Sequence, residues 1–185
     1  MKISIHQPNF VPWYPFFQKI QGADIFIILS HCQFEKNNFQ NRFSVNNQWY
    51  TMRTKKGLDL IENKTYINPY YDWGKIKKGF PKINHITTEF DDCITDSLAT
   101  TNINIIMKAC KLLNINTKIV FDYPTTLKGT SRLVELCKKY KATEYISGIG
   151  AKSYLQPELF EKENIKVTYQ KGLIRKPLFE ILNEQ

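Results

Sequence analysis

His6 and Gln7 are the first neighbouring side chains of the sequence suited to chemistry. A neutral imidazole accepts a proton as a general base, and a carboxamide both donates and accepts hydrogen bonds, so the pair suits activation of a polar substrate. Pro8 and Pro12 follow, and proline favours an extended backbone before it, which would hold both side chains in fixed directions. The alternative is a structural histidine that bonds a backbone carbonyl at a strand end.

A second group of polar side chains lies between residues 33 and 42, in the segment QFEKNNFQNR. Lys36, Asn41 and Arg42 place two cations beside a neutral amide, which suits phosphate or carboxylate recognition with Arg42 as the bidentate partner. A polar connection into a hairpin accounts for the same residues equally well. The sequence leaves both interpretations open.

The segment SGIGAKSY, residues 147–154, resembles a glycine-rich phosphate loop only in part. It lacks the third glycine of a dinucleotide fingerprint and the Gly-Lys-Ser/Thr ending of a P-loop, so it does not indicate NAD or ATP binding.

The cysteines and histidines indicate neither a nucleophile nor a metal centre. Cys32 adjoins His31, but neighbours on an extended chain point in opposite directions, so Cys32 is expected to be a small buried apolar residue. The histidines at 6, 31 and 85 and the four separated cysteines lack the spacing of metal ligands, and we predict no metal site.

The elements that must position these residues alternate between strands and helices. Phe16, Phe17 and Ile20 share one face of a short helix between the first two strands, and Gly22 is placed to end it. Asn46-Asn47 predicts a hairpin turn within residues 41–53, because asparagine tolerates positive φ. Periodicity predicts strands at 2–6, 24–29, 117–123, 143–148 and 165–170, and helices at 102–113 and 130–140.

Alternating strands and helices predict a single α/β domain over residues 1–185, with a mostly parallel sheet flanked by helices, an antiparallel hairpin and a long excursion at 55–97. The excursion should contain one short helix and serve either as a lid or as a surface loop. Polar residues follow four strands: His6 and Gln7, residues 30–33, Asp122, and residues 147–150. Ligands bind at the carboxyl ends of parallel strands, so these groups should surround one pocket.

The composition narrows the classes of partner. The formal charge of +9 suits an anion binder, but 22 lysines against four arginines indicate compositional bias on a solvated surface. No nucleic-acid-reading motif is present, so no nucleic-acid partner is predicted. No apolar run reaches the roughly 18 residues of a membrane span and no signal peptide is evident, so we expect a cytoplasmic protein with reduced thiols.

Several motifs together resemble the WbqC-like family of bacterial proteins, which occur in gene clusters for O-antigen and other surface polysaccharides. They are IHQPNFVPWYPFFQKIQGADIFIIL, then QF-x-K with NR a few residues on, and finally TSRLVELCKKYKATEYISGIGAKSYL. The resemblance covers nearly the whole chain. It implies a site formed by His6, Gln7, Lys36, Asn41, Arg42, Arg132, Ser147 and Tyr154.

The resemblance also implies a function: acyl or aminoacyl transfer to the amine of a nucleotide-linked or lipid-linked amino sugar. His6 would be the base, and Gln7 and Asn41 would orient the acyl carbonyl. No cofactor is predicted beyond an acyl thioester or another activated acyl donor. The partner would be the sugar substrate, and a peripheral contact with the inner membrane face is compatible with it. The alternative is a non-catalytic sugar-nucleotide binding module of a polysaccharide assembly complex.

Two departures from the family pattern bear on activity. Ser30-His31-Cys32 stands where the family usually has an acidic pair, which removes a carboxylate near the pocket. The usual H-P-x-Y-x-Q segment is missing after Gln170, and KGLIRKPLFEILNEQ follows instead. A shortened rim would alter acceptor choice or leave the member inactive.

Overall fold

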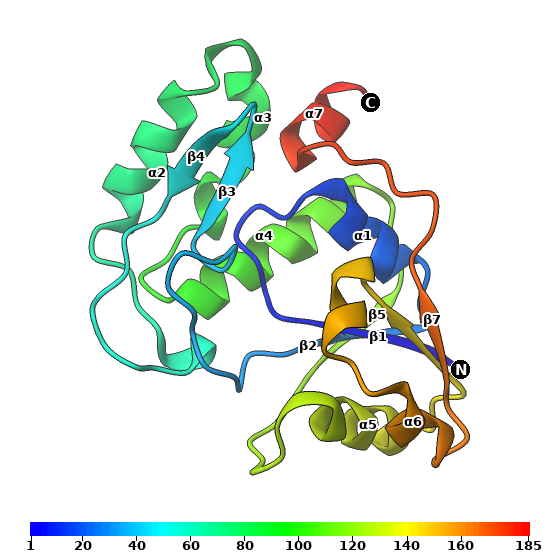
Figure 1. Cartoon of the computed structure of the whole chain (residues 1–185). Coiled ribbons are helices and arrows are strands. Elements are labelled where there is room, and N and C mark those ends of the chain that lie inside the picture. The colour runs from blue at the N-terminus through cyan, green and yellow to red at the C-terminus, as the bar shows by residue number, and fades with distance from the viewer.

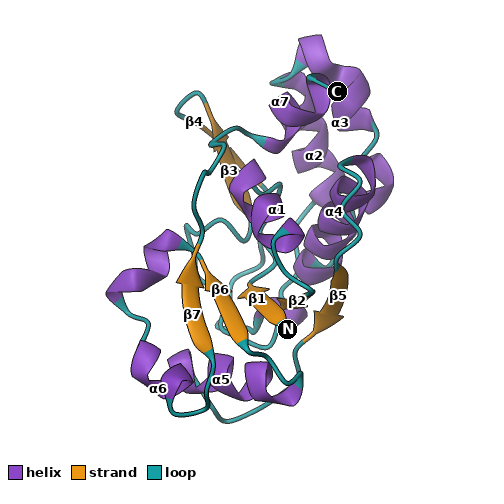
Figure 2. Cartoon of the chain, turned by 90° about the vertical axis from the view of Figure 1, so that its right-hand side faces the viewer, coloured by secondary structure: helices purple, strands orange, loops and turns teal.

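The computed structural model describes residues 1–185, and its centre is the parallel sheet that the sequence predicts. Five strands lie in the order β5-β2-β1-β6-β7, all parallel to their neighbours. They are β1 (Lys2–His6), β2 (Ile25–Ile28), β5 (Lys118–Phe121), β6 (Glu144–Ser147) and β7 (Lys166–Tyr169). Figure 2 shows them side by side.

Helices cover both faces of the sheet (Figure 1). One face carries α1 (Tyr14–Gln21) and α4 (Leu98–Leu112), which pack against Phe26 and Ile28 of β2. The other carries α5 (Gly129–Lys139) and α6 (Pro157–Glu161), which pack against Ile25 and Ile27 of the same strand. The continuous apolar run of β2 is therefore explained by burial on both sides.

The strand order reverses direction between β1 and β6. From β1 the chain proceeds to β2 and β5 on one side, whereas β6 is followed by β7 on the other. The helices after β1 and after β6 consequently lie on opposite faces, and the loops at the carboxyl ends diverge between these two strands. This reversal is where a ligand is expected.

The predicted hairpin is confirmed. It consists of β3 (Arg42–Val45) and β4 (Gln48–Thr51), paired antiparallel. Asn46 and Asn47 both adopt positive φ, 50° and 63°, as a two-residue hairpin turn of the favoured twist requires.

The excursion contains more helix than the single short one expected. It includes α2 (Pro69–Lys78), α3 (Asn84–Thr88) and three 3₁₀ turns, η1 (Ile61–Asn63), η2 (Pro81–Ile83) and η3 (Asp91–Cys93). Asn68 caps α2 through its side chain, and Pro69 occupies the first turn, where its missing N–H costs nothing. The single short helix expected from the sequence therefore understates the helical content of the excursion.

A further helix, α7 (Leu178–Asn183), was not predicted. Its Phe179 is buried against the rings of Phe43, Phe80 and Phe90, so it joins the hairpin and the excursion in one apolar cluster. No helix of the chain is both long enough and apolar enough to span a bilayer.

Candidate functional site

A cavity of about 990 Å³ opens at the carboxyl ends of β1, β2 and β6. Five of the predicted site residues line it: His6, Gln7, Arg132, Ser147 and Tyr154. The start of α5 forms another part of its wall through Lys128, Gly129 and Thr130. The cavity therefore lies where the strand-end rule places a ligand site in a parallel sheet.

The floor of the cavity is formed where β1 and β6 separate. Pairing between these strands ends at Ser4 and Ile146, whereas β1 remains paired with β2 as far as His6. The carbonyl of Ile5 accepts a hydrogen bond from Lys19 Nζ at 2.7 Å. The side chain of Lys19 thus satisfies a backbone carbonyl at the point where β1 and β6 separate.

Lys19 is the main cavity residue that the sequence analysis missed. It lies on α1, is only 4% exposed and lines the cavity. Burial lowers the pKa of its amine from 10.5 to about 7. Its spacing was an available signal, because Lys19 shares the apolar face of α1 with Phe16 and Ile20.

His6 is held as a neutral imidazole. Burial, with a smaller contribution from the charge of Lys19, lowers its pKa from 6.5 to about 4, while its bond to Gln7 opposes the shift. Nδ1 donates to the carbonyl oxygen of Gln7 at 2.9 Å, which leaves Nε2 unprotonated. The ring edge packs against Phe16, and no group of the chain bonds Nε2. The structural role considered for His6 was a hydrogen bond to a backbone carbonyl. Nδ1 makes such a bond, but Nε2 does not.

Gln7 has protein partners on both ends of its amide. Nε2 donates to Cys32 Sγ at 3.2 Å, and Oε1 accepts from Gln40 Nε2 at 2.7 Å. Cys32 is half-buried, and burial raises the pKa of its thiol to about 11. The side chain of Gln7 is therefore rigid, and Cys32 is a thiol rather than a thiolate nucleophile.

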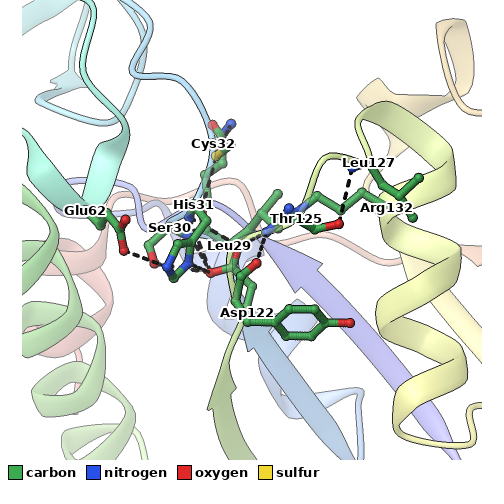
Figure 3. A network of polar contacts seen from close by, with 11 residues as sticks. Leu29, Ser30, His31, Cys32, Glu62, Asp122, Thr125, Leu127 and Arg132 are labelled. Carbon is green, nitrogen blue, oxygen red and sulfur yellow. Dashed lines mark hydrogen bonds and ion pairs between the residues drawn. The ribbon is translucent and has the colours of Figure 1, made fainter.

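Three charged residues and His31 form a continuous network beside the cavity (Figure 3). His31 Nδ1 lies 2.8 Å from Asp122 Oδ1, and its Nε2 lies 2.7 Å from Glu62 Oε2. Arg132 Nη2 donates to Asp122 Oδ2 at 2.5 Å and to the carbonyl of Tyr123. The two carboxylates of the network come from Glu62 in the excursion and from Asp122 after β5.

Asp122 is the centre of this network. It also accepts from Ser30 N and Ser30 Oγ, at 3.0 and 3.2 Å. Burial alone would raise the pKa of Asp122, but hydrogen bonds from His31, Ser30 and Arg132 outweigh that effect and hold the pKa below its usual value. The carboxylate fixes the ends of β2 and β5 and the first turns of α5 relative to one another.

Lys36, Asn41 and Arg42 do not line the cavity. Arg42 stacks over the Trp49 ring at 4.1 Å and donates to the carbonyl of Asn37, while Asn41 Nδ2 donates to the Met52 carbonyl at 2.8 Å. Lys36 is exposed. The structure therefore places these three residues at the hairpin and its entry, apart from the other predicted residues.

Ser147 and Tyr154 occupy different depths of the cavity wall. Ser147 is fully buried at the end of β6, and Tyr154 is 70% exposed just after the short turn η4 (Ile149–Ser153).

Nowhere in the chain do three His, Cys, Asp or Glu side chains converge as metal ligands.

The sequence comparison identifies the family. Residues 7–177 match the WbqC-like protein family. The chain belongs to the WbqC-like protein family. A relative, the uncharacterized protein Rv1507c of Mycobacterium tuberculosis, is 29% identical over 187 residues, covering 91% of this chain and 81% of that protein.

One solved structure gives a weak match. The match pairs the chain with a zinc-bound AdcAII variant of Streptococcus pneumoniae, covering 100% of this chain and 95% of the other at 15% identity. The TM-score of this pair is 0.23.

Proposed function

We propose that this WbqC-like protein is a transferase of surface polysaccharide (O-antigen) biosynthesis, acting in the cytoplasm. It would transfer an acyl or aminoacyl group to the amine of a nucleotide-linked or lipid-linked amino sugar. The observation that carries the proposal is the neutral imidazole of His6, which lines a cavity of about 990 Å³ with its Nε2 free of any partner in the chain.

The reaction requires one proton to leave the nucleophile. The sugar amine attacks the acyl carbonyl of a thioester or similar donor, a C–N bond forms, and the thiolate leaves. The attacking nitrogen becomes strongly acidic as that bond forms, so a base of low pKa can accept its proton. His6 is suited to this step through Nε2, and such a base contributes about 10² to 10⁴ in rate.

The cavity is suited to a substrate of this class. Its volume lies near the upper end of the range for small-molecule sites, about 300–1,000 Å³. Gln7 has a fixed orientation because both ends of its amide are bonded, and Arg132, Ser147 and Tyr154 remain candidates for substrate binding. Lys36, Asn41 and Arg42 would act only on a part of the substrate that extends beyond the cavity.

Replacing the imidazole tests the proposal. We expect His6→Ala to reduce sugar N-acylation at least about 10²-fold, measured by mass spectrometry with a panel of nucleotide-linked amino sugars and acyl thioesters. His85→Gln is the matched control, because His85 is exposed in the excursion and should leave the rate unchanged. An undiminished rate in His6→Ala would eliminate His6 as the base.

The second candidate is a non-catalytic module that binds a sugar nucleotide. It is favoured by the thiol of Cys32, whose raised pKa leaves the cavity without an activated cysteine nucleophile, and by the low basicity of His6. This candidate predicts saturable binding of a nucleotide sugar and no covalent product with any acyl donor.

A further inference from the structure

Two lysine side chains of this protein are almost completely buried, and they differ in one respect. Lys64 is 1% exposed, and its Nζ donates to Asp59 Oδ2 at 2.8 Å and to the carbonyl of Gly57. Lys19 is 4% exposed, and its Nζ bonds only the carbonyl of Ile5, with no carboxylate within 4.0 Å. One buried amine therefore has a counter-ion in the chain, and the other has none.

The missing counter-ion is notable because burying an unpaired ammonium is costly. A purely structural role, satisfying the Ile5 carbonyl where β1 leaves β6, requires a hydrogen-bond donor but no charge. Lys19 also lines the cavity, as do Ser147 at the end of β6 and Gly148 just after it. The amine therefore stands at the reversal of the strand order, where parallel sheets bind ligands.

The acidic side chains around the cavity are already engaged elsewhere. Glu62 pairs with His31, and Glu35 accepts from Asn38. Neither forms an ion pair with Lys19, so the cavity has no carboxylate of its own to neutralise this amine.

We propose that an oxyanionic group of the ligand, a phosphate or a carboxylate, is the counter-ion of Lys19 and sits at the separation of β1 and β6. The proposal rests on the cavity being the substrate site of the proposed function. It identifies the chemical group of the substrate that binds beside Lys19. Burial lowers the pKa of Lys19 to about 7, so near neutrality the amine is readily protonated, and an adjacent anion would favour its charged form.

Thermal unfolding with simple anions tests the proposal without any acyl donor, so its outcome is independent of transferase activity. Sodium phosphate and sodium acetate are each compared with sodium chloride at equal ionic strength and pH 7. We expect at least one to raise the Tm by about 2 °C or more over chloride, because a ligand that binds only the folded form stabilises it. A rise with phosphate alone identifies a phosphate group, and a rise with acetate alone identifies a carboxylate. No rise with either anion would overturn the proposal.

Variants separate the charge of Lys19 from its hydrogen bond. Lys19→Gln can still donate to the Ile5 carbonyl but carries no charge, and it should lose the anion-dependent rise in Tm. Lys19→Arg keeps a cation and should retain most of it. The control Lys118→Gln removes the same charge from an exposed position at the start of β5 and should respond like the wild type. A full response in Lys19→Gln would contradict the proposal.

A measurement on the wild type covers the case in which Lys19→Gln does not fold. The protein is treated briefly with acetic anhydride with and without the anion that raised the Tm, and acetylation of Lys19 is measured by peptide mass spectrometry relative to Lys118. We expect the anion to lower the acetylation of Lys19 at least about threefold with no change at Lys118, because an ammonium paired with an anion does not act as a nucleophile. Equal acetylation of Lys19 with and without the anion would refute the proposal.

Discussion

Nε2 of His31 lies 2.7 Å from Oε2 of Glu62 and joins the loop after β2 to the first turn of the excursion. The other ring nitrogen of His31 contacts Asp122, so carboxylates lie against both nitrogens. The His31 ring therefore adds to the backbone hydrogen bonds from Ile61 N to the Cys32 carbonyl and from Glu62 N to the Ser30 carbonyl, which also join the excursion to this loop.

Glu62→Gln should weaken this connection. We expect the free energy of unfolding to fall by about 1–2 kcal/mol, because the carboxylate that lies 2.7 Å from Nε2 of a partly buried ring is replaced by a neutral amide. Urea titration measures the change. The control is Glu163→Gln, which removes an exposed ion pair with Lys138 and should change stability by less than about 0.5 kcal/mol. Equal effects in the two variants would show that the Glu62 pair is no more than a surface contact.

The depressed pKa of His6 predicts a pH dependence of stability. The folded-state pKa, about 4, lies below the unfolded value of 6.5, so the unfolded chain binds more protons between these values. The free energy of unfolding should therefore fall as the pH drops from 6.5 towards 4, and His6 should contribute no further loss below that. Urea titrations of wild type and His6→Gln across this window check it. Parallel profiles for the two proteins would contradict the prediction.

Asn102 of α4 should be important for the position of the proposed site. Its buried Nδ2 donates to the carbonyls of Pro8 and Gln40, at 2.8 and 2.7 Å, and so fixes the chain that leaves β1. Asn102→Ala would leave both carbonyls buried without a partner and should cost about 3 kcal/mol or more. Asn104→Ala, which removes a single 3.4 Å bond on the same helix, should cost about 1 kcal/mol or less. Chemical denaturation distinguishes the two, and similar costs would exclude a special role for Asn102.

Cys32 should react slowly despite its position at the cavity. Burial raises the pKa of the thiol to about 11, so only a very small fraction is thiolate at pH 7.5. Alkylation of the folded protein by iodoacetamide should be at least about tenfold slower at Cys32 than in the urea-unfolded chain. Peptide mass spectrometry reads the rate at this residue. A rate in the folded protein that matches or exceeds the unfolded one would show an activated cysteine.

The parts of the fold set by local pattern were predictable. The apolar run of β2 indicated a strand buried on both faces, and Asn46-Asn47 indicated the hairpin turn. The strand-end rule brought His6 and Ser147 to one cavity because it depends only on strand direction.

Features that depend on distant contacts were not predictable in the same way. Glu62 reaches His31 from the excursion, and no spacing in the sequence connects them. Helix α7 is short and is held by aromatic contacts of Phe179 with residues 89 to 136 positions earlier, from Phe90 back to Phe43. Arg42 could be recognised as a cation, but its stacking on Trp49 depends on the register of the hairpin.

The packing of Phe179 also affects the order in which the protein can fold. Phe43, Phe80 and Phe90 belong to early parts of the chain, yet the ring that contacts all three is made near residue 180. During synthesis at about 5–20 residues per second, these rings leave the ribosome several seconds before their partner. The aromatic cluster of the hairpin and excursion is therefore completed only after translation of the sheet, so its final closure is a late step in the biogenesis of the protein.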